Sequence, residues 1–77
     1  MAAVSLDDAF QAAHMFLTAA AEELETARHL ADQGDHSGAL MQIAMGVERR
    51  LEHAQVEITG VIESLRQLGG VYPPSST

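Results

Sequence analysis

The chain has 77 residues, no cysteine and a formal net charge of −7, with four arginines and no lysine. This length allows one domain, and the lack of cysteine excludes disulfides and thiolate metal sites. An acidic surface repels phosphate backbones and anionic lipid headgroups, so we expect neither nucleic acid nor a membrane as a partner.

A first helix is predicted over residues 6–33. Ser5 is a favourable N-cap, and Asp7 and Asp8 suit the positive end of a helix. Gly34 is a natural left-handed stop. Apolar residues recur here at alternating steps of three and four, as in helices that pack side by side. They are Leu6, Phe10, Ala13, Leu17, Ala20, Leu24, Ala27 and Ala31.

A turn over residues 34–37 leads to a second predicted helix over residues 38–68, capped by Asp35 or Ser37. Its end is expected at Gly69 and Gly70, followed by an irregular tail over residues 69–77. The second helix carries the same apolar spacing. The residues concerned are Leu40, Ala44, Val47, Leu51, Ala54, Ile58, Val61, Leu65 and Leu68.

A turn this short forces the helices to lie antiparallel, so the predicted fold class is an all-α antiparallel two-helix hairpin, one domain over residues 1–77. We expect both apolar rows to face each other along the seam, with Leu24 opposite Val47 and Ala20 opposite Leu51. No polar residue interrupts either row. Glu23 and Arg50 are predicted to form an ion pair on the flank of the hairpin.

Two helices cannot cover all the apolar residues of this sequence, so we expect the hairpin to form a homodimer, a four-helix bundle. Apolar and small residues beside the predicted seam indicate the surface that would bind the second copy. This predicted oligomer interface consists of Ala9, Ala12, Phe16, Ala19, Leu30, Ile43, Gly46 and Gly60.

The sequence offers little for catalysis or for a cofactor. A metal site in a helical bundle needs ligands that point inward, often with a Glu-x-x-His motif. Here the residue three positions before His53 is Arg50, and both apolar rows lack ionisable residues. No serine lies in a nucleophile elbow. We therefore expect no enzyme, no cofactor and no metal.

Met41 and Met45 lie one helical turn apart, away from the apolar rows. Methionine side chains adapt to partners of different shape, so this pair is a candidate partner patch. The alternative is that both residues complete the oligomer interface or cap the end of the hairpin.

The leading functional hypothesis is a small acidic, non-enzymatic protein–protein interaction module: an adaptor, an inhibitor or immunity-type protein, or a regulatory subunit. Its second hypothesised partner, besides itself, is a basic protein. The alternative is a metal- or small-ligand-binding bundle that uses surface histidines and glutamates. Because the first ten residues lack the pattern of a signal peptide, we expect a cytoplasmic protein. The acidic surface would comprise Glu22, Glu25, Glu48, Glu52, Glu57 and Glu63.

Overall fold

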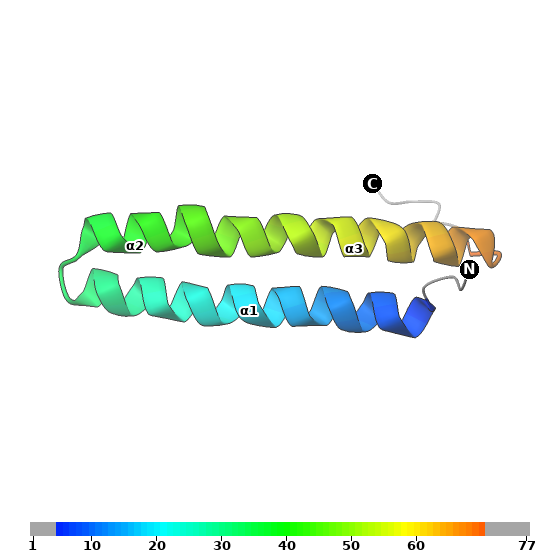
Figure 1. The fold of residues 1–77 in the computed structure, drawn as a ribbon, viewed down its shortest axis with the longest axis horizontal. Helices are drawn as coiled ribbons and strands as arrows, with labels where there is room; N and C mark the ends of the chain where they lie inside the picture. Colours follow the sequence, from blue (N-terminus) through cyan, green and yellow to red (C-terminus); the bar gives the residue numbers. More distant parts are fainter. Residues whose placement is uncertain (1–4, 71–77) are drawn as a thin grey trace.

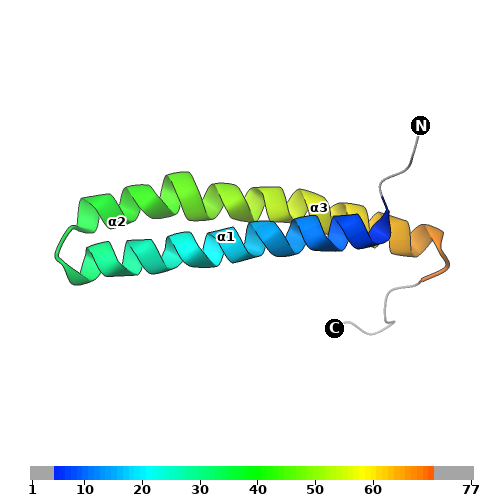
Figure 2. The same cartoon turned by 60° about the horizontal axis from the view of Figure 1, so that its bottom comes forward.

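The computed structural model, which describes residues 5–70, is an all-α antiparallel hairpin of two helical arms. Helix α1 (Leu6–Asp32) forms the first arm. The second arm consists of α2 (His36–Gln42), the π-helical segment η1 (Ile43–Val47) and α3 (Glu48–Gln67). Figures 1 and 2 show the arms side by side along their length, joined by one turn. Of the predicted tail, only Gly69 and Gly70 belong to the described residues.

Both arms begin at capping side chains. The Ser5 hydroxyl accepts a hydrogen bond from the backbone N–H of Asp8 at 3.0 Å, as predicted. At the second arm, the Asp35 carboxylate accepts from the backbone N–H of Gly38 at 2.9 Å. Asp35, and not Ser37, is therefore the N-cap. Each cap satisfies an N–H group that has no partner within its own helix.

The turn between the arms depends on Gly34, whose φ angle is +86°. Its N–H donates to the carbonyl of Ala31 at 3.0 Å, and the N–H of Asp35 donates to the carbonyl of Leu30 at 2.9 Å. This pair of bonds is a Schellman motif, which satisfies the last carbonyls of α1. The second arm ends in the same way at Gly69, where φ is +107°.

Alanine at Gly34 is expected to destabilise the hairpin by about 1 kcal/mol, because an L side chain is strained at positive φ. A Cβ atom at this position would meet no other atom within 4 Å, so any loss reports the backbone alone. Gly60 is the matched control, since it lies within α3 and is equally unobstructed. Gly60→Ala is expected to stabilise by about 0.5–1 kcal/mol. Urea unfolding measures both; a stabilising Gly34→Ala would contradict the expectation.

The segment η1 is a feature that the sequence analysis missed. Ala39, Ile43 and Val47 face the first arm at successive steps of four residues. In an α-helix each such step turns the row by about 40° away from the seam. A π-helical turn holds more residues than an α-helical turn, so it returns Val47 to the seam. The 4-4 spacing becomes a signal for such a turn once the residues of the seam are known.

The seam is built from small side chains. Every buried residue in the described part of the chain is an alanine or a valine. Small residues allow two helices to approach closely, because no large side chain separates their backbones. The buried residues are Ala13, Ala20, Ala27, Ala39, Val47, Ala54 and Val61.

The large residues of the predicted rows are not in the seam, which corrects the sequence analysis. Phe10, Leu17, Leu24, Leu51, Ile58 and Leu65 remain 39–52% exposed. The predicted pairing along the arms agrees with two contacts between them, Phe16 with His53 and Glu23 with Arg50, to within two residues. Compared with the prediction, each helix is rotated about its own axis by roughly 50°, which is half of the angle of about 100° between successive residues. The buried alanines belong to both the predicted and the observed seam, whereas the leucines belong only to the predicted one and turn outward.

Candidate functional site

The most conspicuous surface feature is a face of large apolar side chains, which we call the leucine face. Its members come at seven-residue intervals on both arms. The ring of Phe16 contacts that of His53, with centroids 5.1 Å apart, on one side of the buried rows. Positions on the other side of both rows therefore share the opposite face of the hairpin. The leucine face consists of Phe10, Leu17 and Leu24 of α1 with Leu51, Ile58 and Leu65 of α3.

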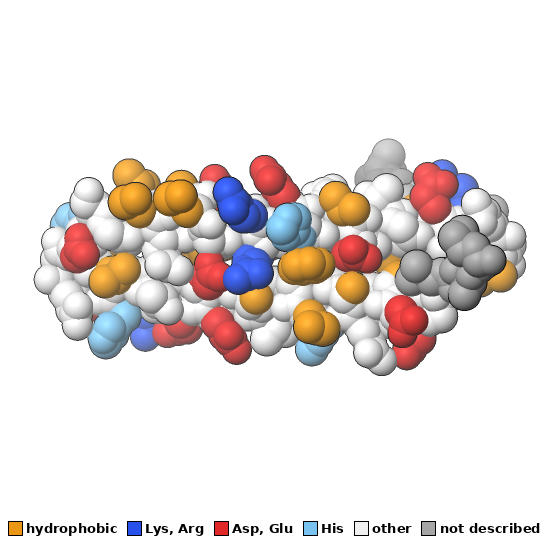
Figure 3. Space-filling model, viewed as in Figure 1, with side chains coloured by type: hydrophobic (Ala, Val, Ile, Leu, Met, Phe, Trp, Pro, Cys, Tyr) orange, Lys and Arg blue, Asp and Glu red, His pale blue; other side chains and the backbone are white. Residues whose placement is uncertain are grey.

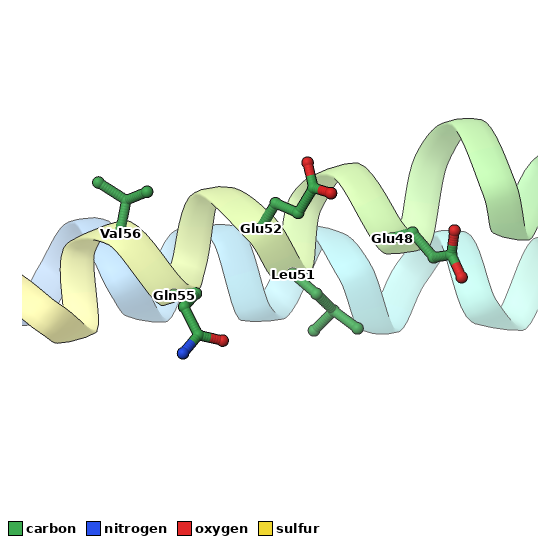
Figure 4. Close-up of a pocket in the computed structure, with 5 residues that line it drawn as sticks. All are labelled: Glu48, Leu51, Glu52, Gln55 and Val56. Atoms are coloured by element: carbon green, nitrogen blue, oxygen red, sulfur yellow. The ribbon is translucent and has the colours of Figure 1, made fainter.

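Two shallow depressions border this face. One, with a volume of about 580 Å³, is lined by Leu51 and its neighbours on α3. Figure 4 shows Leu51 and Gln55 pointing to one side of the helix and Val56 to the other. The second, of about 530 Å³, lies at Phe10 and His14 on α1. In residues 5–70 no polar side chain is buried, so neither depression offers an enclosed polar group to orient a small ligand.

The opposite face carries the predicted ion pair between Glu23 and Arg50. Arg50 Nε donates to Glu23 Oε2 at 3.0 Å, and the Glu23 side chain is only 22% exposed. Glu23 thus lies partly within the seam, which we had expected to be free of polar residues. Gly46 provides the space, because a Cβ atom there would collide with the Glu23 carboxylate. Figure 3 shows this face, where charged and histidine side chains separate the apolar ones.

A double-mutant cycle on Glu23 and Arg50 is expected to give a coupling free energy below about 1 kcal/mol. The arginine side chain is 43% exposed, so solvent screens the pair. Glu23→Ala, Arg50→Ala and the double variant would be compared by urea unfolding. A coupling of several kcal/mol would mean that the pair is far better shielded than these exposures indicate.

Most residues of the predicted oligomer interface are half-buried in the single chain. These are Ala9, Ala12, Phe16, Ala19, Leu30, Ile43 and Gly46, whereas Gly60 is exposed. Phe16 contacts His53 on the other arm, so part of its surface is used within the hairpin. The role of these eight residues in self-association stays a prediction.

Met41 and Met45 project from the second arm, 61% and 60% exposed. Together with Glu23 and Gly46 they line a depression of about 390 Å³. This depression lies beside the ion pair, away from the leucine face. A role for it as a partner patch stays a prediction.

The histidines and carboxylates are dispersed. His29 forms a 3.3 Å hydrogen bond with Gln33, and Arg28 lies 3.9 Å from Glu25 on the exposed surface of α1. Between residues 5 and 70, no three His, Asp or Glu side chains gather closely enough to hold a metal ion. Over the same residues, no helix combines the length and apolarity needed to cross a bilayer.

In comparisons with known proteins, the chain matches no family model, no curated protein and no solved structure. Its own residues and geometry are therefore the basis for the proposals that follow.

Proposed function

We propose that this hairpin is a non-enzymatic protein–protein interaction module that pairs with a second copy of itself through the leucine face to form a four-helix bundle. The observation that carries this proposal is an inversion of side-chain sizes. Alanine and valine fill the seam, whereas the large apolar side chains face solvent. A two-helix hairpin with so small a core gains little stability from burial, and short chains often rely on oligomerisation.

The rotation of the helices supports a bundle in particular. In a square four-helix bundle, each helix directs its core row about 45° away from its neighbour, toward the central axis. The heptad rows that contain Leu17 in α1 and Leu51 in α3 are turned from the seam by roughly 50°, both toward the leucine face. The apolar rows therefore point where the centre of a four-helix bundle would lie.

The size of the face is adequate for such an assembly. Its six side chains leave 39–52% of their area exposed. This amounts to on the order of 500 Å² of apolar surface per chain, or roughly 1,000 Å² for a pair. Specific interfaces begin near about 1,200 Å² in total, and the flanking residues would supply the remainder. An apolar patch of this size is near the upper end of the largest patches on typical monomers, about 300–600 Å², and such patches are often functional.

Sedimentation equilibrium over a wide concentration range tests the proposal. We expect a species of twice the chain mass of 8.2 kDa, with dissociation only on dilution. A monomer at all concentrations, with its helix content intact, would overturn the self-association.

A basic protein remains the proposed second partner. Glu22, Glu25, Glu48, Glu52 and Glu63 are exposed, whereas Glu57 is half-buried. Pairing through the leucine face would leave most of this acidic surface accessible and would double its charge. Binding to such a partner should weaken steeply with salt, because exposed charges are screened within about 10 Å at 0.1 M.

A further inference from the structure

We propose that the two copies pack with their turns at opposite ends of the bundle, so that α1 lies on α1 of the second copy and α3 on α3. This inference rests on the proposed self-association and specifies its arrangement. Two-fold symmetry allows one other way to join the leucine faces, with both turns at the same end and α1 on α3. All neighbouring helices are antiparallel in either arrangement, so helix direction does not choose between them.

Side-chain size distinguishes the two arrangements. On α1 the leucine face is bulky near the chain end, at Phe10, and small near the turn, where Ala31 continues the seven-residue spacing. Turns at the same end would place Phe10 beside Ile58 and Leu65 of the partner subunit, with large residues against large ones. Turns at opposite ends place Phe10 between Leu24 and Ala31 of the partner subunit when the rows interleave. Opposing large and small residues keep the core volume even along the bundle.

Charge distinguishes them as well. Beside the leucine face, α1 carries Asp7 and Arg28, spaced by three heptads, and α3 carries Glu48 and Gln55. With turns at opposite ends, interleaving brings Asp7 to within about 4 Å, along the bundle axis, of Arg28 of the partner subunit. It also brings Glu48 near Gln55 of the partner subunit.

With turns at the same end, Asp7 would instead lie beside Ile62 of the partner subunit. That arrangement gives Asp7 no basic neighbour in this row. The match of opposite charges therefore favours turns at opposite ends, in agreement with the match of sizes.

Within residues 5–70, neither Asp7 nor Arg28 has a close partner of opposite charge that would compete with the proposed contact. Asp7 accepts a hydrogen bond from Gln11 at 2.9 Å, and Arg28 has only its 3.9 Å contact with Glu25. Both residues are exposed. They lie about 30 Å apart along α1, so they can meet only between copies.

Spin-label distances test the arrangement, and the absence of native cysteine makes labelling specific. A label at Asp32→Cys, beside the turn, should give a separation of about 40 Å between copies. A label at Thr18→Cys, near the middle of α1, should give a much shorter one. Equal separations at the two positions would overturn the arrangement with turns at opposite ends, but they would still be consistent with a dimer. A monomer would instead overturn the proposed function.

Charge reversal gives an independent readout. Asp7→Arg and Arg28→Asp should each raise the dimer dissociation constant by roughly fivefold, since exposed ion pairs contribute little. The variant carrying both reversals should recover most of the affinity. Asp8→Arg is the matched control, because it loses the same favourable charge in the first turn but lies away from the leucine face. A double variant as weak as the single ones would rule out the contact.

Discussion

Glutamate in place of Leu17 is expected to raise the dimer dissociation constant by at least about 100-fold, because pairing would bury a charge in each copy. Leu17 lies in the middle of the leucine face and is 43% exposed in the single chain. The substitution therefore disturbs the contact between copies far more than the seam. Helix content should fall as well, since an alanine-rich seam alone gives a marginal fold. Sedimentation equilibrium and circular dichroism measure the two effects.

Val56→Glu is the matched control for this experiment. Val56 is 67% exposed on the same hairpin but lies outside the leucine face. Its replacement adds the same charge and should leave the mass and the helix content unchanged. If Leu17→Glu kept the wild-type mass, the leucine face would not be the contact surface. If both variants dissociated equally, overall charge and not position would be the cause.

Leucine in place of Ala54 is expected to destabilise the protein by about 1–3 kcal/mol or more, although it adds apolar surface. Ala54 is 1% exposed in the seam between the two arms. A leucine there must push the arms apart, and this separates the other alanine contacts along the seam. The free energy of unfolding in urea measures the effect at a fixed protein concentration.

Thr26→Leu provides the comparison for Ala54→Leu, because it adds a leucine at an exposed position of α1 that lies away from both the seam and the leucine face. Its effect should stay within about 0.5 kcal/mol. Little loss from Ala54→Leu would show that the seam is looser than the structure has it. Leu51→Ala, which we would expect to cost 2–5 kcal/mol for a residue buried in the seam, should instead act mainly through self-association, because Leu51 is 46% exposed.

The ends of the helices were predictable because they depend on local chemistry. Ser5 caps α1 through its own hydroxyl, and Gly34 ends α1 through its own φ angle. Such interactions span three to six residues and need no knowledge of the rest of the fold. The π-helical segment could not be predicted from local chemistry alone. The spacing from Ala39 to Val47 signals it only once the residues of the seam are known.

The candidate site was only partly predictable. The sequence contains three neighbouring apolar rows on α1, represented by Phe16, Ala20 and Leu24, and the middle row is common to both possible seams. Heptad spacing fits equally well a seam that combines the alanine row with the row of Leu24 and one that combines it with the row of Phe16. The leucine face was therefore assigned to the seam, and half-buried residues such as Phe16 were assigned to the surface.

The sequence by itself determined an antiparallel helical hairpin, its turn and its pairing along the arms. Caps and glycines act over short distances, and the heptad spacing together with the position of the turn sets which residues lie opposite each other. Only the tertiary structure decided which side of each helix faces the other. That choice depends on how closely two backbones can approach, which alanines such as Ala54 permit and leucines do not. The same packing leaves the leucines exposed, and from them we infer a second copy.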